Sequence, residues 1–568
     1  MESHTSTTKQ EKHPAAFLWE LISPDKHFFN VAIVYSVAIS ILTLSVPIAV
    51  QTLINTLVNI SSLRAIIILS ILLFLGLSIS AALSAMRTRT MEYFQRRIYA
   101  RLTAEVSLHT IYARHEYFAG RRNTDITNRY FDIVVLQKNI PFLLVDGFAL
   151  LLQMIVGFTL VSFYHPVLLM FNLGVILSLL LIWRLWGHSA INTAVALSHA
   201  KYQTSKWLDS LAYAHEFFKS TRHIDYALER TEQLTAEYVK THSDHFKYTF
   251  SQTIAFLMLY AAASAALLGI GGWLVTINQL SLGQLIAAEL ILAAILFGLS
   301  KTSEYLKFYY EMCGAADELG KIFSIPQENI EMRANRTMEG SYLSFENVTL
   351  DNNPCKFNFT IPEKTKIVVH AENVNTQYSF IHLLKRNIHP QSGAIQLAGV
   401  DFSDFDVYRL RQDIVVIDRA PIVECTIEEY LDMSQPGSAI AEMRSVLMQV
   451  NIMDEIDKLP QGLKTLLSPL GDPLSPASFL QLKLAATLLT QPKILILTPF
   501  FDLLTKESIK SIMNSISELP LTVLYFTKQD HSDSVDHQLQ LGETKQTLIA
   551  GKNSQTILPL NDPGVDRE

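Results

Sequence analysis

The first three hundred residues alternate between long apolar stretches and shorter polar, charged stretches. Crossing a bilayer as a helix takes roughly 20 apolar residues, and the chain reaches that length repeatedly. We predict six membrane spans, with tight turns at His165-Pro166 between the third and fourth and at Asn278-Gln279 between the fifth and sixth. The stretches that carry them are Phe28–Leu63, Ala65–Met86, Gly147–Trp183 and Tyr248–Ser300, and Glu289 is the one Asp, Glu, Lys or Arg among them.

Arginines gather directly after the second span and orient the whole bundle. Because cytoplasmic loops carry an excess of Lys and Arg, this cluster places the end of the second span in the cytoplasm. Six spans then leave both ends of the chain inside, with two long helical excursions over 87–140 and about 187–247. The arginines are Arg87, Arg89, Arg96, Arg97 and Arg101.

A mixed pattern of short strands and helices replaces the apolar pattern from Ser341 onward. The preceding polar segment, IPQENIEMRANRTMEG, is typical of a linker between two domains. We therefore expect a cytoplasmic N-terminal segment (1–27), a six-span domain (28–323), a linker (324–340) and a soluble domain (341–568).

Composition agrees with a polytopic membrane protein that has a soluble half. Of the 568 residues, 49% are hydrophobic and 17% are charged, which is too apolar for a soluble protein of this size. The net charge of -7 gives no reason to expect a nucleic-acid partner. Cys313, Cys355 and Cys425 have neither paired nor metal-ligand spacing, so we predict no metal site from them. The polar start lacks the pattern of a cleavable signal peptide, and we expect the first span to target the membrane.

The stretch KIVVHAENVNTQYSFIHLL has the order of a phosphate-binding loop without its chemistry. We predict a buried strand over Lys366–His370, a turn over Ala371–Gln377 and a helix from Tyr378. A P-loop places GxxxxGK[ST] in such a turn, so that backbone N–H groups surround phosphate and a Lys reaches its terminal oxygens. Here the turn has no glycine, Gln377 stands at the Lys position, and Glu372 adds a negative charge.

The sequence after this stretch, HPQSGAIQLAGVDFSDFDVYRLRQDIVVIDRAPIVECTIEEYL (His389–Leu431), resembles the nucleotide-binding domain of ATP-binding cassette (ABC) exporters. YLSFENVTL (Tyr342–Leu350) resembles the first strand of that domain, and six spans precede it, as in the family. The resemblance covers essentially the whole chain. It implies a membrane α-helical domain of six transmembrane helices followed by an α/β P-loop-NTPase-like ABC domain.

The same resemblance implies a cellular location, a dimer partner and cofactors. It places the chain in the cell (inner or plasma) membrane, in contact with the lipid bilayer, with the ABC-like domain in the cytoplasm. Because six spans make only half of the family's pathway, it implies a homodimer or heterodimer with a second ABC half-transporter. ATP and Mg2+ are the family's cofactors, and its substrates include peptides, lipids and drugs; the sequence leaves the substrate unknown.

The family's catalytic positions are degenerate in this chain. By alignment Gln377 replaces the phosphate-binding Lys, Thr498 the metal-binding Asp, Pro499 the catalytic Glu and Lys528 the switch His. The other former nucleotide-site positions are Asn352 for the adenine-stacking aromatic, Ala371, Thr376, Tyr378 and Ser379 in the phosphate loop, Arg419 for the loop Gln, and Ser475 in the signature, which reads LSPAS.

These replacements together remove the Lys that neutralises phosphate charge, the acid that binds the metal and the base that activates water. Each of these groups can accelerate ATP hydrolysis by orders of magnitude. Pro476 also removes a backbone N–H donor from the signature. We therefore expect no catalytic residue, no metal site, weak or absent binding of ATP and Mg2+, and no ATP hydrolysis by this chain. The retained ILIL and LPQGLKTLL segments indicate a hydrophobic skeleton that was kept while the chemistry drifted.

Three functions remain open at this point. The chain is a transport subunit beside a competent half, a non-transporting membrane scaffold or regulator, or the product of a decaying gene. The intact hydrophobic skeleton weighs against the third. An ionisable residue at membrane depth is a candidate functional group, so Glu289 is our candidate transport-pathway residue; the alternative is a wet position near the outer interface.

Overall fold

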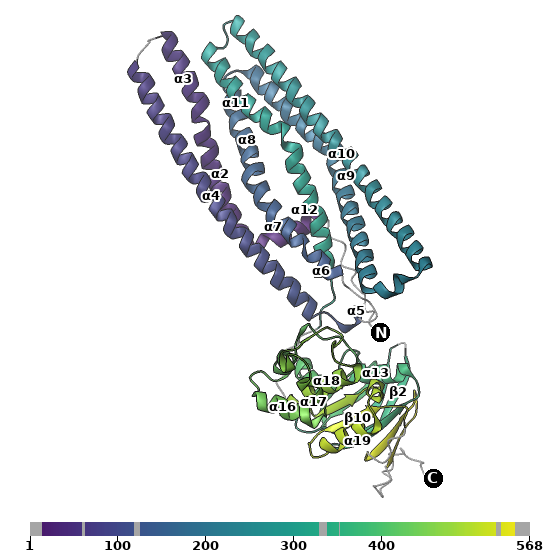
Figure 1. The fold of residues 1–568 in the computed structure, drawn as a ribbon. Coiled ribbons are helices and arrows are strands. Elements are labelled where there is room, and N and C mark those ends of the chain that lie inside the picture. Colours follow the sequence, from purple (N-terminus) through teal and green to yellow (C-terminus); the bar gives the residue numbers. More distant parts are fainter. Residues whose placement is uncertain are drawn as a thin grey trace, which may run out of the picture. The chain divides into compact units, whose positions relative to one another are not determined.

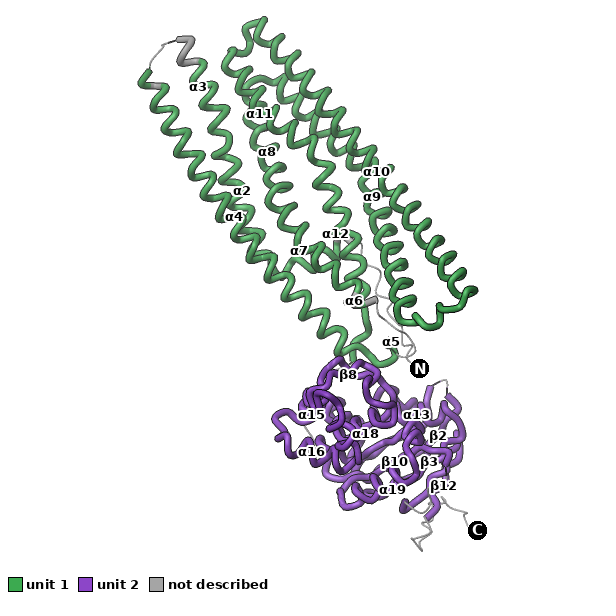
Figure 2. Tube along the Cα trace, in the orientation of Figure 1, with its two compact units in different colours: residues 1–328 green, residues 329–568 purple. Residues whose placement is uncertain are grey.

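A computed structural model describes residues 14–59, 63–118, 125–328, 338–351, 353–529 and 535–550. The chain divides into two compact units, residues 1–328 and residues 329–568 (Figure 2). The named elements of the first unit are all helices over its described residues, and the second unit combines β-sheets with shorter helices (Figure 1).

The first unit contains six helical stretches long and apolar enough to cross a membrane, which confirms the six predicted spans. Within the first of them, Leu44 separates the helix over Lys26–Thr43 from the helix over Ser45–Asn59. The elements of the unit are α1 (Pro14–Ile22), η1 (Ser23–Asp25), α2 (Lys26–Thr43), α3 (Ser45–Asn59), α4 (Leu63–Ile111), α5 (His115–Phe118), α6 (Asp125–Tyr130), α7 (Asp132–Phe142), η2 (Leu143–Gly147), α8 (Phe148–Ser162), α9 (Pro166–Tyr213), η3 (His215–Lys219), α10 (Thr221–Thr276), α11 (Leu282–Ser300) and α12 (Thr302–Phe323).

Local sequence signals set the outer ends of two spans. The first N–H groups of a helix have no partner inside the helix, so a neighbouring side chain usually satisfies them. At α9 the His165 ring accepts a hydrogen bond from the Val167 N–H at 3.1 Å. At α11, Ser281 and Gln284 bond each other's backbone N–H groups in a capping box. Both caps lie in the two turns that the sequence predicts.

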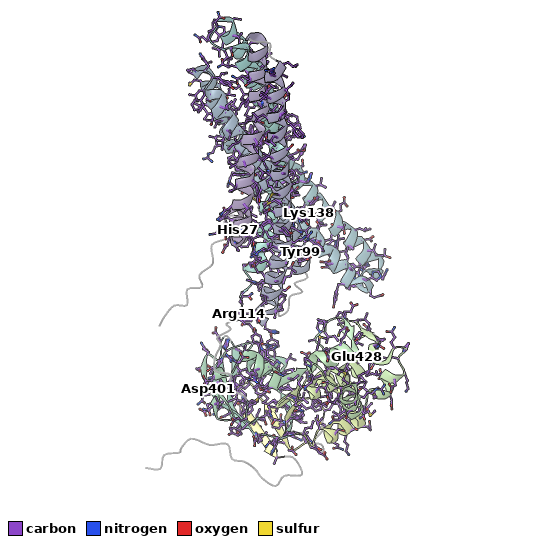
Figure 3. The ribbon with its side chains drawn as sticks, turned by 90° about the vertical axis from the view of Figure 1, so that its left-hand side faces the viewer. His27, Tyr99, Arg114, Lys138, Asp401 and Glu428 are labelled. Atoms are coloured by element: carbon purple, nitrogen blue, oxygen red, sulfur yellow. The ribbon has the colours of Figure 1, made fainter. Side chains whose placement is uncertain are left out.

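Several helices continue beyond their apolar part into a charged region. The labelled His27, Tyr99, Arg114 and Lys138 all lie in this half of the first unit (Figure 3). Asp25 is buried here, and its carboxylate accepts hydrogen bonds from Arg97 Nε at 2.8 Å and Arg101 Nε at 3.0 Å. Buried charges are tolerated when they are paired and hydrogen-bonded, so this acid fixes η1 to α4.

The second unit contains three β-sheets, a six-stranded one of order β12-β11-β3-β10-β9-β6, a four-stranded one of order β2-β1-β4-β5, and the pair β7-β8. In the largest sheet β11, β3, β10, β9 and β6 are parallel, and β12 is antiparallel at its edge. The strands are β1 (Leu343–Leu350), β2 (Asn353–Ile361), β3 (Lys366–Ala371), β4 (Ser392–Leu397), β5 (Val400–Asp401), β6 (Ile414–Ile417), β7 (Cys425–Thr426), β8 (Leu466–Leu467), β9 (Ile494–Leu497), β10 (Thr522–Phe526), β11 (His537–Leu541) and β12 (Gln546–Ala550).

Both faces of the largest sheet are covered, which explains why a strand such as β9 is uniformly apolar. Its Leu495 and Leu497 join one hydrophobic core, and its Ile494 and Ile496 join the other. The helices of this unit are α13 (Val374–Leu384), η4 (Phe402–Asp404), α14 (Val407–Asp413), α15 (Ile427–Ser434), α16 (Ile440–Gln449), α17 (Met453–Asp457), η5 (Gly462–Lys464), α18 (Pro476–Leu489), η6 (Pro499–Leu503) and α19 (Lys506–Ser515).

Close packing between α8 and α11 depends on a glycine. A Cβ placed on Gly157 would lie 2.5 Å from Ile295 Cδ1 and 2.9 Å from Ile291 Cγ2. Small residues at helix contacts let membrane helices approach each other, and van der Waals packing is the main attraction between them. Gly157 therefore allows these two spans to approach closely.

We predict that Gly157→Ala destabilises the first unit by about 1–3 kcal/mol, because the added methyl overpacks the contact and the β-branched Ile291 has little rotamer freedom to withdraw. Gly174→Ala in α9 is the matched control, since a Cβ there meets no atom within 4 Å and alanine is the better helix former. Thermal unfolding of both variants in one detergent measures the difference. Equal melting temperatures would contradict the close contact.

Candidate functional site

The carboxyl edge of the six-stranded sheet gathers most of the residues that the sequence singled out. Strands β3, β10, β9 and β6 are parallel neighbours, so the segments that follow them emerge at one edge. In open α/β sheets this edge is where ligands bind. The positions brought there are 371–379 at the end of β3 and after it, Lys528 after β10, Thr498 and Pro499 after β9, and Arg419 after β6.

The connection from β3 to α13 is much shorter than the sequence predicted. We expected a turn over Ala371–Gln377, but Ala371 still belongs to β3 and the helix begins at Val374, which corrects both boundaries. Asn373 explains the early start, because its side chain accepts a hydrogen bond from the Thr376 N–H at 2.8 Å. Asn is among the strongest helix N-caps, a signal that the P-loop alignment obscured. An open loop of N–H groups is therefore replaced by a helical turn.

Two carboxylates lie beside the start of α13. Glu372 Oε2 accepts a hydrogen bond from the Glu543 N–H at 2.9 Å, and the Asn373 amide donates to Glu543 Oε1 at 2.8 Å. Glu543 follows β11, 171 residues from Glu372, and no local signal in the sequence pointed to it. The positive end of a helix dipole attracts anions, but here two acids of the same chain already lie next to it.

The remaining positions of the former phosphate loop have separate roles in packing. Thr376 is buried, and its hydroxyl donates to Asn373 Oδ1 at 3.1 Å. Ser379 is buried and accepts a hydrogen bond from Asn353 Nδ2 at 2.8 Å. Gln377 is half-buried, and Tyr378 is exposed with its ring 3.8 Å from that of His382. Asn352, the predicted adenine-side position, lies outside the described residues.

At the end of β9 the side chains hold the sheet together. The Thr498 hydroxyl donates to the Ile417 carbonyl at 2.8 Å and joins β9 to β6. Pro499, which opens η6, has neither a carboxylate nor an N–H. Asp502 in η6 accepts hydrogen bonds from the hydroxyls of Tyr525 and Thr527. Sequence reasoning missed this acid, because its partners lie on and after β10. Burial raises the pKa of Tyr525, and the hydrogen bond to the negatively charged Asp502 raises it further.

The cations at this edge also contact their own unit. The Arg419 guanidinium lies 5.5 Å from the centre of the Phe500 ring, a cation–π distance. Lys483 of α18 is buried and donates to the carbonyls of Asp418 at 2.9 Å and Ala420 at 2.5 Å. Burial lowers the pKa of Lys483. Lys528, at the switch position, is exposed.

The former signature segment caps α18. Ser475 is the N-cap, and its hydroxyl oxygen accepts a hydrogen bond from the Ser478 N–H at 3.1 Å. The Ser478 hydroxyl in turn donates to Glu455 Oε2 at 2.6 Å. Pro476 follows at the first helical position, where a missing N–H is tolerated. The hydroxyl of Ser475 thus serves the helix itself.

Glu289, the candidate in the membrane, lies in α11 of the first unit. Its side chain is half-buried, and its Oε2 atom is buried without a hydrogen-bond partner among the described residues. Arg87 of α4 is a buried charge of the same unit, and it donates to Ser36 Oγ and the Val145 carbonyl, both at 3.1 Å. One Arg87 nitrogen therefore has acceptors, whereas Arg87 Nε and Glu289 Oε2 both lack a hydrogen-bond partner among the described residues.

A third cluster, missed by sequence reasoning, joins α6, α9 and α12 in the charged half of the first unit. Ligand atoms of His199, Asp317 and Glu318 lie within 4.8 Å of one another, a donor set that can hold a metal ion. Lys321 Nζ lies 2.7 Å from Glu318 and 3.3 Å from Asp317, and Arg129 Nε lies 3.0 Å from Glu318. With two cations against the same two carboxylates, the cluster fits an ion-pair network better than a metal centre.

Comparisons with known proteins bear on both units. Residues 29–300 match the family model of the ABC transporter transmembrane region. The Leukotoxin translocation ATP-binding protein LktB of Mannheimia haemolytica is 21% identical over 516 residues, covering 89% of this chain and 72% of the relative. The proteins of the same name from Mannheimia glucosida and Bibersteinia trehalosi match with the same identity and coverage.

Among solved structures, a bacterial Atm1-family ABC exporter with ATP bound has a TM-score of 0.75 and 16% sequence identity to this chain. The similarity covers 92% of this chain and 95% of the exporter, so it extends over the helical unit and the sheet-containing unit alike. Six spans followed by one such domain is the fold the sequence predicted. Together these similarities support an ABC exporter half-transporter, a multi-pass inner-membrane protein with six apolar helices and a cytoplasmic ABC domain.

Proposed function

We propose that this chain is a transport subunit, one half of a dimeric ABC exporter, and that its own ABC domain does not hydrolyse ATP. The family supports transport and a second half, and the curated relatives are named for translocation of a leukotoxin. We further propose residues 28–323 as the membrane domain, 324–340 as the linker and 341–568 as the degenerate ABC domain. The substrate is not specified by these relationships.

The carboxyl edge of the large sheet carries the proposal. ATP hydrolysis needs a phosphate cradle, a metal-binding acid and a base that positions water. At the cradle position the first turn of α13 is closed by Asn373, with Glu372 and Glu543 beside it. At the metal and base positions the Thr498 hydroxyl is bonded within the sheet, and Pro499 has no titratable group.

In this proposal the second half supplies the ATP chemistry. In a dimer, each nucleotide site would combine the phosphate loop of one half with the signature segment of the other half. A partner with an intact phosphate loop would bind nucleotide opposite LSPAS of this chain, so that site would be weakened. The second site would contain the degenerate phosphate loop of this chain and would be weaker still. The membrane domain of this chain would contribute half of the transport pathway, with Glu289 as a pathway residue. Purification of the full chain from its native membranes tests this, because the proposal requires a co-purifying chain that carries GxxxxGK[ST] and restores ATP-dependent transport.

A second function, a non-transporting membrane scaffold or regulator, is favoured by the capped tip of α18. Ser475 and Ser478 use their hydrogen bonds within the helix and on Glu455, so this segment is a poor second cradle for a partner's nucleotide. A stable co-purifying complex in which the partner transports no better with this chain than without it would favour the scaffold.

We predict that the purified full chain hydrolyses ATP no faster than background in Mg2+-containing buffer. The absent Lys, Asp and Glu each supply orders of magnitude in rate, so Gln377→Lys alone should restore nothing. A phosphate-release assay on wild type, Gln377→Lys and Gln377→Ala measures this. Mg2+-dependent turnover that disappears in Gln377→Ala would overturn the prediction, and a complete exporter half serves as the positive control.

We also predict that millimolar ATP leaves the melting temperature of the chain unchanged. A ligand that binds the folded state at 100 times its Kd stabilises it by about 2.7 kcal/mol, which a melting curve readily detects. The acids at Glu372 and Glu543 repel phosphate, and the Thr376 N–H is already bonded to Asn373. The double variant Glu372→Gln and Glu543→Gln tests how much of the effect comes from repulsion between these two acids and phosphate. An upward shift in the wild type would show that a nucleotide site survives.

A further inference from the structure

We propose that Glu289 binds an organic cation, a primary ammonium or guanidinium group carried by the transported substrate. The inference rests on the proposed transport function and adds the chemical class of the substrate. It starts from a property of the whole sequence. Residues 28–63, 65–86, 147–183 and 248–300 contain one Asp, Glu, Lys or Arg in total, and that residue is Glu289. No Lys or Arg within these stretches is available as its counterion.

Glu289 lies inside the hydrocarbon region. It is the eighth residue after the N-cap Ser281 at the outer turn, and at a rise of 1.5 Å per residue this places it about 12 Å along the helix. The hydrocarbon core of a bilayer is about 30 Å thick. A carboxylate at this depth is costly and, where it occurs, usually faces the protein interior or a water-filled pathway.

The half-buried carboxylate of Glu289 differs from the buried acids of the first unit in having no cation beside it among the described residues. Asp25 lies against Arg97 and Arg101, Asp132 against Lys201, and Glu318 against Lys321. Glu289 Oε2 is buried without a hydrogen-bond partner, as are Asp132 Oδ2 and Glu318 Oε2, but no described cation forms an ion pair with Glu289. A buried polar atom without a partner costs free energy, and such an atom is retained in a functional site when a ligand supplies the missing partner.

The apolar side chains around Glu289 on α11 favour an organic cation over a metal ion. Ile291 and Ile295 lie on the side packed against Gly157 of α8, whereas Leu290 and Phe297 lie on the side that the chain leaves exposed, at 40% and 60%. Glu289 borders that exposed side, between apolar residues. A metal ion such as Mg2+ or Ca2+ requires several oxygen ligands, and the single described group of three metal-type side chains lies elsewhere, at His199. One carboxylate in an apolar wall suits an amphiphilic organic cation.

Binding of a matched pair of probes to the full chain tests this assignment. Dansylcadaverine carries a primary ammonium group, and its N-acetyl derivative is neutral but otherwise the same. We expect wild-type chain in phosphatidylcholine nanodiscs to bind the ammonium probe about tenfold or more tightly than the acetylated probe, because a charge-assisted hydrogen bond adds that much affinity. Dansyl fluorescence, corrected with empty nanodiscs, measures both dissociation constants.

Three variants locate the effect. Glu289→Gln should abolish the preference for the ammonium probe, and Glu289→Asp, which keeps the charge, should retain most of it. Glu304→Gln is the matched control, because Glu304 is exposed and lies beyond the apolar part of the same segment. Equal binding of both probes by the wild type, absence of ammonium binding, or an unchanged preference in Glu289→Gln would overturn the proposal.

The measurement needs neither a partner chain nor nucleotide, so its outcome is separate from that of the proposed transport function. Loss of the ammonium preference in Glu289→Gln supports the cation site even if no partner restores transport. Transport of a neutral substrate by the assembled pair, without any effect of Glu289→Gln, would leave the transport function standing and refute the cation site.

Discussion

Inside a bilayer no water is available to a peptide group, so each backbone amide must be hydrogen-bonded within the protein. The first unit meets this constraint with long helices, and its short connections at the outer side are closed by side-chain caps such as His165 and Ser281. Van der Waals packing rather than the hydrophobic effect holds such helices together. The contact of Gly157 with Ile291 and Ile295 is one place where two helices pack closely.

Where the helices leave the bilayer, water is again available to polar groups, and the helices are joined by pairs of charged side chains. Asp25 is enclosed by two arginines, and Glu318 connects α12 to α6 through Arg129. Such buried ion pairs contribute little net stability, but removal of one partner is costly because the other is left buried and unpaired. They therefore tie helices that are distant in sequence into one arrangement. Glu289, on the apolar side of this division, has no such partner among the described residues.

In the second unit, the residues that form the fold are different from the residues at the carboxyl edge of the sheet. Its two hydrophobic cores lie on opposite faces of the large sheet and include β9 from both sides, and the strands keep the parallel order that brings four connections to one edge. The groups at that edge are bonded to their own unit, as with Thr498 on Ile417 and Asn373 on Thr376. A core depends on apolar volume and pattern, whereas a catalytic edge depends on a few individual side chains, so the second can change while the first is conserved.

Much of this protein is determined by sequence pattern alone. Apolar runs of sufficient length can be satisfied in a bilayer only as helices, so the six spans and their turns are readable without coordinates. The strand before the former phosphate loop was readable for a similar reason, since a short apolar run next to a helical pattern predicts a buried parallel strand. The replacements at Gln377, Thr498 and Pro499 are likewise facts of the sequence, once the family alignment places them.

The tertiary structure decided what lies next to what. The P-loop template predicted an open turn up to Gln377, but the cap by Asn373 starts the helix at Val374, because a local hydrogen bond outweighed the template. The approach of Glu543 to Glu372 depends on β11 lying beside β3, and the pairing of Asp25 with α4 depends on how the helices pack. Contacts between residues far apart in the chain follow from the packed fold as a whole, and no local pattern records them.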